Sequence, residues 1–189
     1  LKKGSSGTPV LQSELEYTQR TAGDATIYPI SKETKYRDDA GTEALETTYA
    51  YDWHTDSVQV KQRTVTLPVV STAQNGPGTA TTQKQVYDER GNLTWMMDGR
   101  GFITRMTYDQ VLGVMLQRIE DADTSLLSGV PSGWSTPSGG GKHLVTDYEI
   151  DSQGRTTQQL GPAHTIDLGG TATEVRRATW TVYKDAEHA

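Results

Sequence analysis

The sequence contains no cysteine and only one phenylalanine among its 189 residues. Without cysteine, the chain can form no disulfide framework, no thiolate zinc site and no cysteine nucleophile. No apolar run approaches the roughly 20 residues needed to span a bilayer as a helix, so membrane insertion is not expected. Because the chain begins with Leu1 instead of methionine, we expect it to be an excerpt from a longer polypeptide.

Basic residues are also in short supply. The 18 lysines and arginines are outnumbered by 24 aspartates and glutamates, which gives a net charge of −6 at pH 7. General nucleic-acid binding depends on basic side chains that neutralise phosphates, and binding to anionic membranes has the same requirement. The sequence therefore predicts neither a nucleic-acid partner nor an anionic-membrane partner.

The residues that are abundant favour strands. The chain has 28 threonines, 9 tyrosines and 4 tryptophans, and β-branched and aromatic residues are enriched in pleated, half-buried strands. Charged residues make up 22%, which does not fit the highly charged, disordered class. An all-β fold is the expected class.

A short phrase recurs, in which an aspartate is followed three residues later by glycine. The pairs are Asp38 and Gly41, Asp88 and Gly91, Asp98 and Gly101, and Asp151 and Gly154, with a looser pair at Asp109 and Gly113. An aspartate at a turn entrance accepts hydrogen bonds from the backbone two residues on, and glycine can adopt a positive φ without a Cβ clash. The pattern predicts consecutive antiparallel β-hairpins with short loops.

Between these turns, the sequence predicts strands at 83–88, 92–97, 102–108 and 114–120, with a further strand group within 56–70. In 102–108 the alternation places Phe102, Thr104, Met106 and Tyr108 on one face, and Ile103, Arg105 and Thr107 on the other. We expect the sheet to bury one face. Helical spacing is poor throughout, and its best candidate is the short segment 41–47.

The glycine-, serine- and proline-rich stretch 124–142 is expected to be a loop or linker. On that basis we divide the chain into a degenerate repeat region at 1–123, this linker, and a further repeat-like β segment at 143–189. The three parts are expected to form one continuous structural unit.

The stretch 87–109 resembles the RHS or YD repeat of large bacterial proteins. The matching residues are Tyr87, Asp88, Gly91, Asn92, Leu93 and Thr94, then Asp98, Gly101 and Thr104, and then Tyr108 and Asp109. A weaker match follows Tyr148 through Asp151, Gly154, Arg155 and Thr157. In all, the good match covers about 35 residues, and it is specific for a repeat motif because several positions agree over two consecutive units.

The resemblance implies a fold and a role. Proteins of this family are very large secreted or surface polypeptides, whose hairpins form a continuous, curved strip that spirals into a hollow shell. In toxin-bearing members the shell encloses a C-terminal toxic domain, and animal relatives support cell adhesion. We therefore expect a structural, non-enzymatic segment at the cell surface or outside the cell, with neighbouring repeats, an enclosed C-terminal domain or a surface glycan as its partners.

Chemical alternatives have weaker signals. No two histidines have zinc-ligand spacing, and no G-x-S-x-G nucleophile motif occurs, so no enzyme activity, metal or cofactor is expected. Turn aspartates could in principle bind calcium, but turn capping explains them without a metal. Trp134 lies in a loop with no obvious local core and is a candidate for stacking against a sugar in a carbohydrate-binding or adhesive module.

Overall fold

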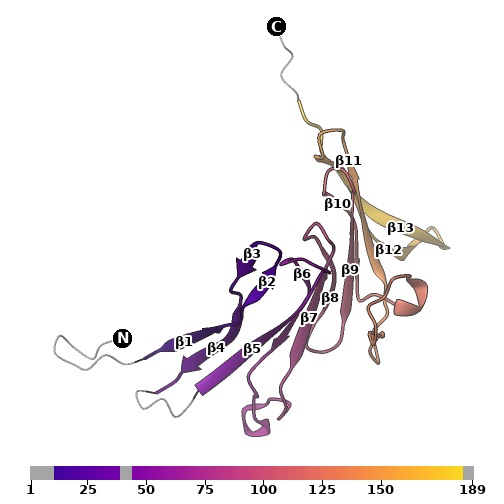
Figure 1. Cartoon of the computed structure of the whole chain (residues 1–189). Coiled ribbons are helices and arrows are strands. Elements are labelled where there is room, and N and C mark those ends of the chain that lie inside the picture. Colours follow the sequence, from indigo (N-terminus) through magenta and orange to yellow (C-terminus); the bar gives the residue numbers. More distant parts are fainter. Residues whose placement is uncertain (1–10, 39–43, 185–189) are drawn as a thin grey trace, which may run out of the picture. The chain divides into compact units, whose positions relative to one another are not determined.

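The computed structural model describes residues 11–38 and 44–184, and these residues form strands and connections with no α-helix (Figure 1). The strands are β1 (Ser13–Tyr17), β2 (Arg20–Ala22), β3 (Ala25–Ile27), β4 (Ile30–Tyr36), β5 (Ala44–Trp53), β6 (Val60–Thr66), β7 (Thr82–Tyr87), β8 (Leu93–Met97), β9 (Ile103–Tyr108), β10 (Met115–Glu120), β11 (Leu144–Ile150), β12 (Thr156–Leu168) and β13 (Thr171–Trp180). Two 3-10 turns, η1 (Thr72–Gln74) and η2 (Thr124–Leu126), lie in long connections.

The all-β prediction is confirmed. The strands expected at 83–88, 92–97, 102–108 and 114–120 are β7 to β10, with each boundary displaced by no more than one residue, and β6 lies within 56–70. The helical candidate at 41–47 is wrong where the structure describes it, because residues 44–47 begin β5. β5 pairs with β4 on one side and β6 on the other, and this pairing outweighs local propensity. Residues 41–43, including Gly41 of the first predicted turn, lie outside the described residues.

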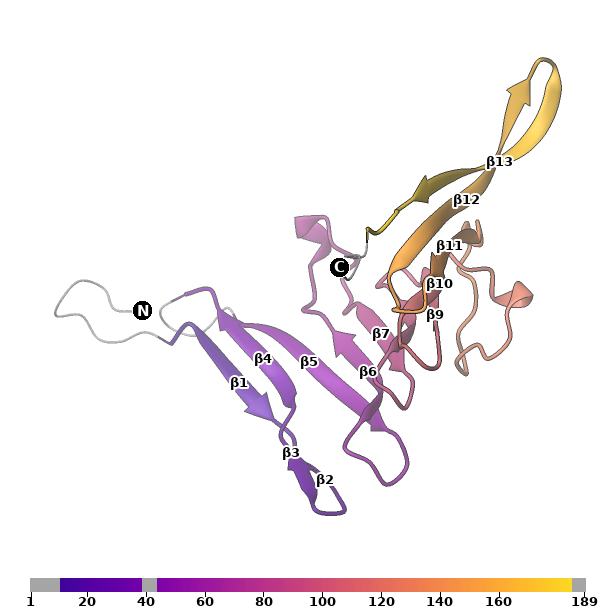
Figure 2. The same cartoon turned by 90° about the horizontal axis from the view of Figure 1, so that it is seen from above.

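The chain divides into two compact units. Unit 1 holds β1 to β7 together with the turn residues 98–100, and unit 2 holds β8 to β13. The predicted linker 124–142 falls within unit 2. In unit 1 the strand order is β1-β4-β5-β6-β7, and every neighbouring pair is antiparallel. The short β2–β3 hairpin is inserted between β1 and β4 (Figure 2).

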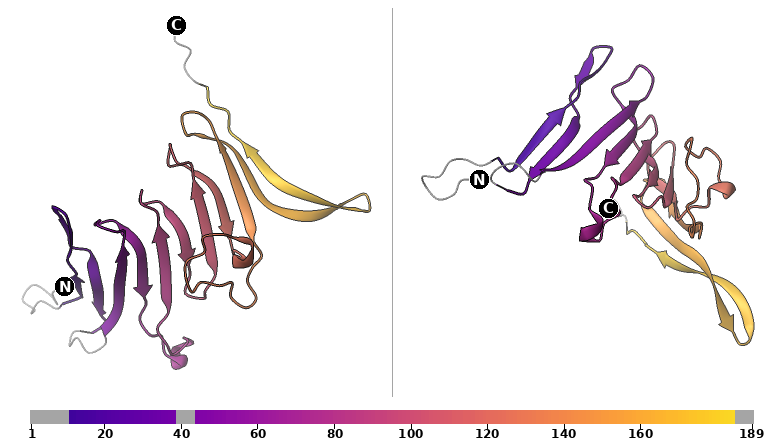
Figure 3. Two further views of the ribbon diagram at one scale, coloured as in Figure 1. Left: turned by 45° about the vertical axis from the view of Figure 1, so that its right-hand side comes forward. Right: turned by 90° about the horizontal axis from the view of Figure 1, so that it is seen from below.

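Unit 2 has the order β8-β9-β10-β11-β12-β13, again with antiparallel neighbours. Its last two strands form a long hairpin in which β11 pairs only with the part of β12 up to Leu160. The remainder of this hairpin extends beyond its neighbours as a two-stranded ribbon (Figure 3). The register shifts between Leu160 and Ala163, where the ribbon begins.

Burial is concentrated in unit 2. Among the described residues, the buried apolar side chains are Trp95, Ile103, Met106, Ile119, Ala122 and Trp134. All six belong to unit 2. In unit 1 the only fully buried side chain among the described residues is Thr34. Unit 1 is therefore a sheet held mainly by its hydrogen-bond ladder and by half-buried side chains on its faces.

The expectation of a single buried face is wrong for β9. Ile103 and Met106 are three residues apart, so they point to opposite faces of the strand, yet they are only 0% and 7% exposed. The chain returns to the start of β9 after β10, where the backbone N–H of Ala122 donates a hydrogen bond to the Ile103 carbonyl at 2.8 Å. This return brings the long connection after β10 against the sheet, which an alternating sequence pattern cannot reveal.

Candidate functional site: the aspartate–glycine turns

The turn after β7 shows how each aspartate–glycine pair works. The Asp88 carboxylate accepts a hydrogen bond from the backbone N–H of Arg90 at 2.9 Å. The N–H of Gly91 donates to the Asp88 carbonyl at 3.0 Å, and Gly91 has a φ of +86°. A residue with a Cβ is strained at such a φ. Asn92 follows the turn immediately and is half-buried before β8 begins.

The next turn repeats this chemistry. The Asp98 carboxylate accepts a hydrogen bond from the N–H of Arg100 at 2.9 Å. The guanidinium of Arg100 folds back to 3.4 Å from the same carboxylate. Gly101 has a φ of +89°. The charges of this exposed ion pair contribute little, so the backbone hydrogen bond and the glycine define the turn.

In the looser pair, Asp109 and Gly113, the loop has one more residue, and the aspartate accepts hydrogen bonds from two consecutive N–H groups. One carboxylate oxygen of Asp109 accepts from the N–H groups of both Val111 and Leu112, at 2.8 and 2.7 Å. The N–H of Gly113 donates to the Asp109 carbonyl at 3.0 Å, and Gly113 has a φ of +68°. The same two residue types therefore close a longer loop between β9 and β10.

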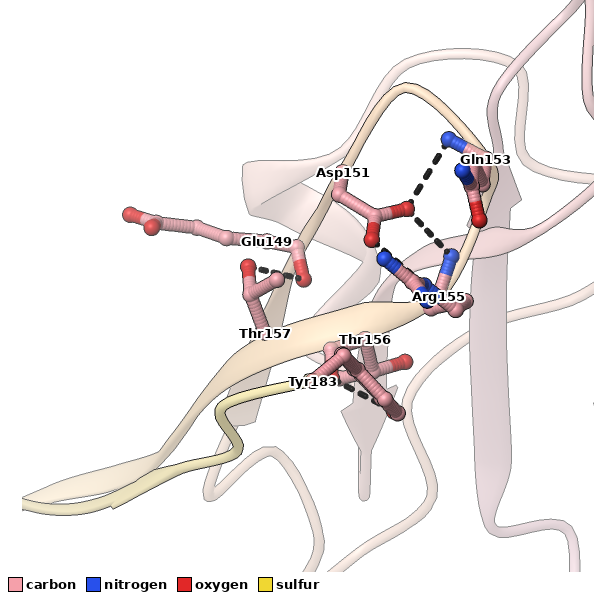
Figure 4. Close-up of polar contacts among 7 residues, drawn as sticks. All are labelled: Glu149, Asp151, Gln153, Arg155, Thr156, Thr157 and Tyr183. Carbon is pink, nitrogen blue, oxygen red and sulfur yellow. Dashed lines mark hydrogen bonds and ion pairs between the residues drawn. The ribbon is translucent and has the colours of Figure 1, made fainter. Parts of the chain in front are cut away.

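In the turn between β11 and β12, both carboxylate oxygens of Asp151 accept hydrogen bonds (Figure 4). One carboxylate oxygen of Asp151 accepts from the N–H groups of Gln153 and Arg155, at 2.9 and 3.0 Å. The other oxygen accepts from Nε of Arg155 at 2.7 Å. Gly154 has a φ of +79°, and its N–H donates to the Asp151 carbonyl at 3.0 Å.

A tyrosine from beyond β13 closes over this turn. The guanidinium of Arg155 lies 4.4 Å from the centre of the Tyr183 ring, within the range of a cation–π contact. The Tyr183 hydroxyl donates to the Thr156 carbonyl at 3.1 Å (Figure 4). A segment about 30 residues further along the chain therefore stabilises the β11–β12 turn.

These bonds alter the acidity of Asp151. The backbone N–H of Arg155, followed by the Arg155 side chain and the N–H of Gln153, holds the pKa of Asp151 below its ordinary value. Hydrogen bonds donated to a carboxylate stabilise its charged form. The turn is consequently strongest when Asp151 is ionised.

This lowered pKa predicts acid sensitivity. Because the folded pKa lies below the unfolded value of about 3.9, the stabilisation by Asp151 is fully present above that value and is lost as the pH falls through the folded pKa. We expect Asp151→Asn to lower the urea midpoint at pH 7, and the deficit relative to wild type to shrink steadily below about pH 4. Glu89→Gln, which removes an exposed turn carboxylate, is the matched control. A deficit that stays constant down to pH 2.5 would contradict the assignment.

Of the three repeat tyrosines, Tyr87 and Tyr108 make hydrogen bonds to residues of the described strands and their connections. The Tyr108 hydroxyl donates to the Leu93 carbonyl at 2.9 Å, which ties β9 to the start of β8. The Tyr87 hydroxyl donates to the Gln85 side chain at 3.0 Å, and the Tyr87 carbonyl lies 3.1 Å from a ring nitrogen of His54. Tyr148 is half-buried within β11.

Trp134 lies in the loop between β10 and β11 and is only 7% exposed. The base of this loop is closed by Asp121, whose carboxylate accepts from the N–H groups of Gly141 and Lys142 at 2.8 and 3.1 Å. The Asp121 carbonyl also accepts from the N–H of His143 at 2.9 Å. Because its side chain is buried, Trp134 offers a sugar no open ring face unless the loop moves.

The sequence analysis did not identify two aspartates that bond nearby backbone N–H groups, nor one arginine that contacts neighbouring strands. Asp167 accepts from the N–H of Gly170 at 2.6 Å in the β12–β13 turn, and Asp123 caps η2 through the N–H of Ser125. The sequence D-L-G-G at the first of these offered the same aspartate–glycine signal. Arg176 of β13, whose guanidinium contacts both β11 and β12, gave no local signal.

The described residues contain no group of three or more histidines, aspartates or glutamates that could hold a metal ion. In the same part of the chain, no helix is long and apolar enough to cross a membrane. The turn carboxylates instead bind the chain's own backbone, so what this arrangement does chemically is to fix hairpin geometry. No protein-family model matches the chain, and comparison with curated proteins gives no match.

Proposed function

We propose that this chain is a structural, non-enzymatic segment of a large extracellular RHS/YD-repeat protein, in which it forms part of a β-sheet shell or surface scaffold. The observation that carries the proposal is the recurrence of one turn design between consecutive antiparallel strands. At Asp88, Asp98, Asp109 and Asp151, a carboxylate accepts the N–H group two residues later. A glycine with positive φ follows each time.

The open edge strands of the sheet favour the proposal that the partners belong to the same polypeptide. Among the described strands, β1 pairs only with β4 and β13 pairs only with β12. An open strand edge presents unpaired N–H and C=O groups, and repeat arrays satisfy such groups with the neighbouring repeat. Neighbouring repeats are therefore the partners that we propose first, followed by an enclosed C-terminal domain or a cell-surface glycan.

The non-enzymatic part of the proposal rests on how the acidic side chains are used. Catalytic carboxylates need an oxygen directed at a substrate. In the turns, the carboxylate oxygens of Asp109 and Asp151 instead accept two or more hydrogen bonds from the chain itself. This pattern is typical of residues that build a loop.

The proposal predicts that the parent polypeptide covers edge β13. Arg177 lies in this strand and is exposed, so trypsin should cleave after it in the isolated chain. In the parent protein with its native flanking sequence, we expect this cleavage to be slower by at least about tenfold, because a paired strand must open before a protease can bind it. Equal rates in the two proteins would contradict the repeat array.

The surface location is tested separately. Antibody against the chain should label intact source cells, and labelling only after permeabilisation would contradict the surface location.

A further inference from the structure

A cavity of about 210 Å³ opens on unit 1, between the base of the β2–β3 hairpin and strands β4 and β5. Apart from the small Ala50, the side chains around it are aromatic or neutral and polar. They belong to Thr18, Gln19, Ser31, Tyr49, Tyr51 and Trp53. None of these side chains carries a charge at neutral pH, although the chain as a whole is acidic.

Strand β5 supplies the aromatic wall of this cavity. Its side chains alternate strictly between exposed and half-buried positions, so Tyr49, Tyr51 and Trp53 share one face. The rings of Tyr51 and Trp53 stack with centroids 5.5 Å apart and planes 27° from parallel. The Tyr51 hydroxyl donates to the Ile30 carbonyl at 2.8 Å, which fixes the ring against β4. The wall is thus held in place by packing and by a hydrogen bond.

The β2–β3 hairpin supplies the opposite, polar wall. The N–H of Thr18 donates to the Pro29 carbonyl at 2.9 Å and closes the base of the hairpin. Arg20 then anchors the hairpin to β5, since its guanidinium lies 5.6 Å from the centre of the Trp53 ring and its Nε donates to the Ser57 carbonyl at 3.1 Å. The hydroxyl of Thr18 and the neighbouring amide are thereby held beside the aromatic rings.

From this juxtaposition we propose that the cavity binds a neutral saccharide. Aromatic rings offer apolar surface to the C–H groups of a sugar, while tyrosine and tryptophan also carry a polar group. Hydroxyl and amide groups can both donate to and accept from sugar hydroxyls. The Arg20 guanidinium beside the cavity is already engaged with the Trp53 ring and the Ser57 carbonyl, so the uncharged lining favours a neutral ligand. The volume is below the roughly 300–1,000 Å³ of drug-sized pockets, which suits one or two sugar rings.

This inference does not depend on the proposed repeat array, and it gives the glycan that we propose as a partner a specific binding site. It also differs from stacking on Trp134, because the cavity lies in unit 1 and Trp134 is buried in a loop of unit 2. A scaffold without a saccharide site would leave the protease and surface-labelling results unchanged. The two proposals can therefore fail separately.

The test is a titration of the ¹⁵N-labelled chain followed through the indole N–H resonances of its four tryptophans. The probes are lactose, cellobiose and N,N′-diacetylchitobiose, with galacturonic acid as the charged comparison. We expect at least one neutral disaccharide to shift the Trp53 resonance with a Kd of about 10 mM or tighter. The resonances of Trp95, Trp134 and Trp180 should stay in place.

Two substitutions locate the site. Tyr49→Ala removes part of the aromatic wall, and Gln19→Ala removes an exposed amide from the polar wall, so that it tests the site even if the first variant folds poorly. Each should weaken binding by at least about fivefold, close to the loss of one hydrogen bond. Trp180→Ala, which removes an exposed tryptophan elsewhere, should leave binding unchanged. An unmoved Trp53 resonance with all three disaccharides, equal binding of galacturonic acid, or unaltered affinity in Gln19→Ala would overturn the proposal.

Discussion

Replacing Arg176 by methionine is expected to lower the free energy of unfolding of unit 2 by about 2–4 kcal/mol. The Arg176 guanidinium donates to three backbone carbonyls, those of Gly161, Leu160 and Val145, at 2.6, 3.0 and 3.0 Å. It also forms an ion pair with Asp147 at 2.7 Å. Methionine keeps most of the apolar volume but leaves all four acceptors without this donor.

The expected loss is smaller than for a fully buried ion pair because the Arg176 side chain is still 29% exposed. Water can therefore hydrate some of the acceptors that lose their donor. Urea denaturation followed by tryptophan fluorescence measures the change. Arg177→Met is the matched control, since the neighbouring arginine is exposed and its replacement should change the stability by less than about 0.5 kcal/mol. Equal effects of the two variants on the free energy of unfolding would show that the contacts of Arg176 do not stabilise unit 2.

Valine in place of Gly154 is the second change with a large expected effect, about 2–3 kcal/mol of destabilisation. Gly154 has a φ of +79°, which a β-branched residue adopts only with strain. A Cβ at this position would also lie 3.1 Å from a methyl carbon of Val114, so packing opposes the substitution as well. At Gly91, where the nearest atom would lie at 3.4 Å on the flexible Gln59 side chain, valine should cost less.

The matched control at this position is Gly154→Asn. Asparagine tolerates a positive φ much better than valine, so the difference between the two variants isolates backbone strain and β-branching from the mere addition of a side chain. We expect Gly154→Asn to reduce the free energy of unfolding by less than half as much as Gly154→Val does. If the urea midpoints of both variants equal that of wild type, the turn does not depend on glycine at this site.

The strands and turns were predictable because their causes are local. An aspartate oxygen reaches the N–H group two residues ahead within a single turn, as Asp88 does with Arg90, and alternation with a period of two is visible in any strand. The boundaries of β7 to β10 follow directly from the spacing of these turns. Local rules of this kind need no knowledge of distant residues.

The local contacts of Asp123 and Asp167 were missed although their signal lay within three residues, but the other features that escaped prediction join residues far apart in the chain. Arg176 reaches a carbonyl 31 residues away, and Tyr183 reaches one 27 residues away. Gly99 is constrained by something other than positive φ, since a Cβ there would collide with a methyl carbon of Thr81. No periodicity or turn motif encodes such encounters.

The sequence by itself determined the all-β class, the positions of strands β7 to β10 and the aspartates and glycines of the turns between them, because each of these depends on hydrogen bonds and backbone dihedrals within a few residues. Only the tertiary structure decided which side chains are buried, that both Ile103 and Met106 are covered, and that the rings of β5 face a polar hairpin. Burial depends on which distant segment returns to a given face, and that choice is made when the whole chain packs.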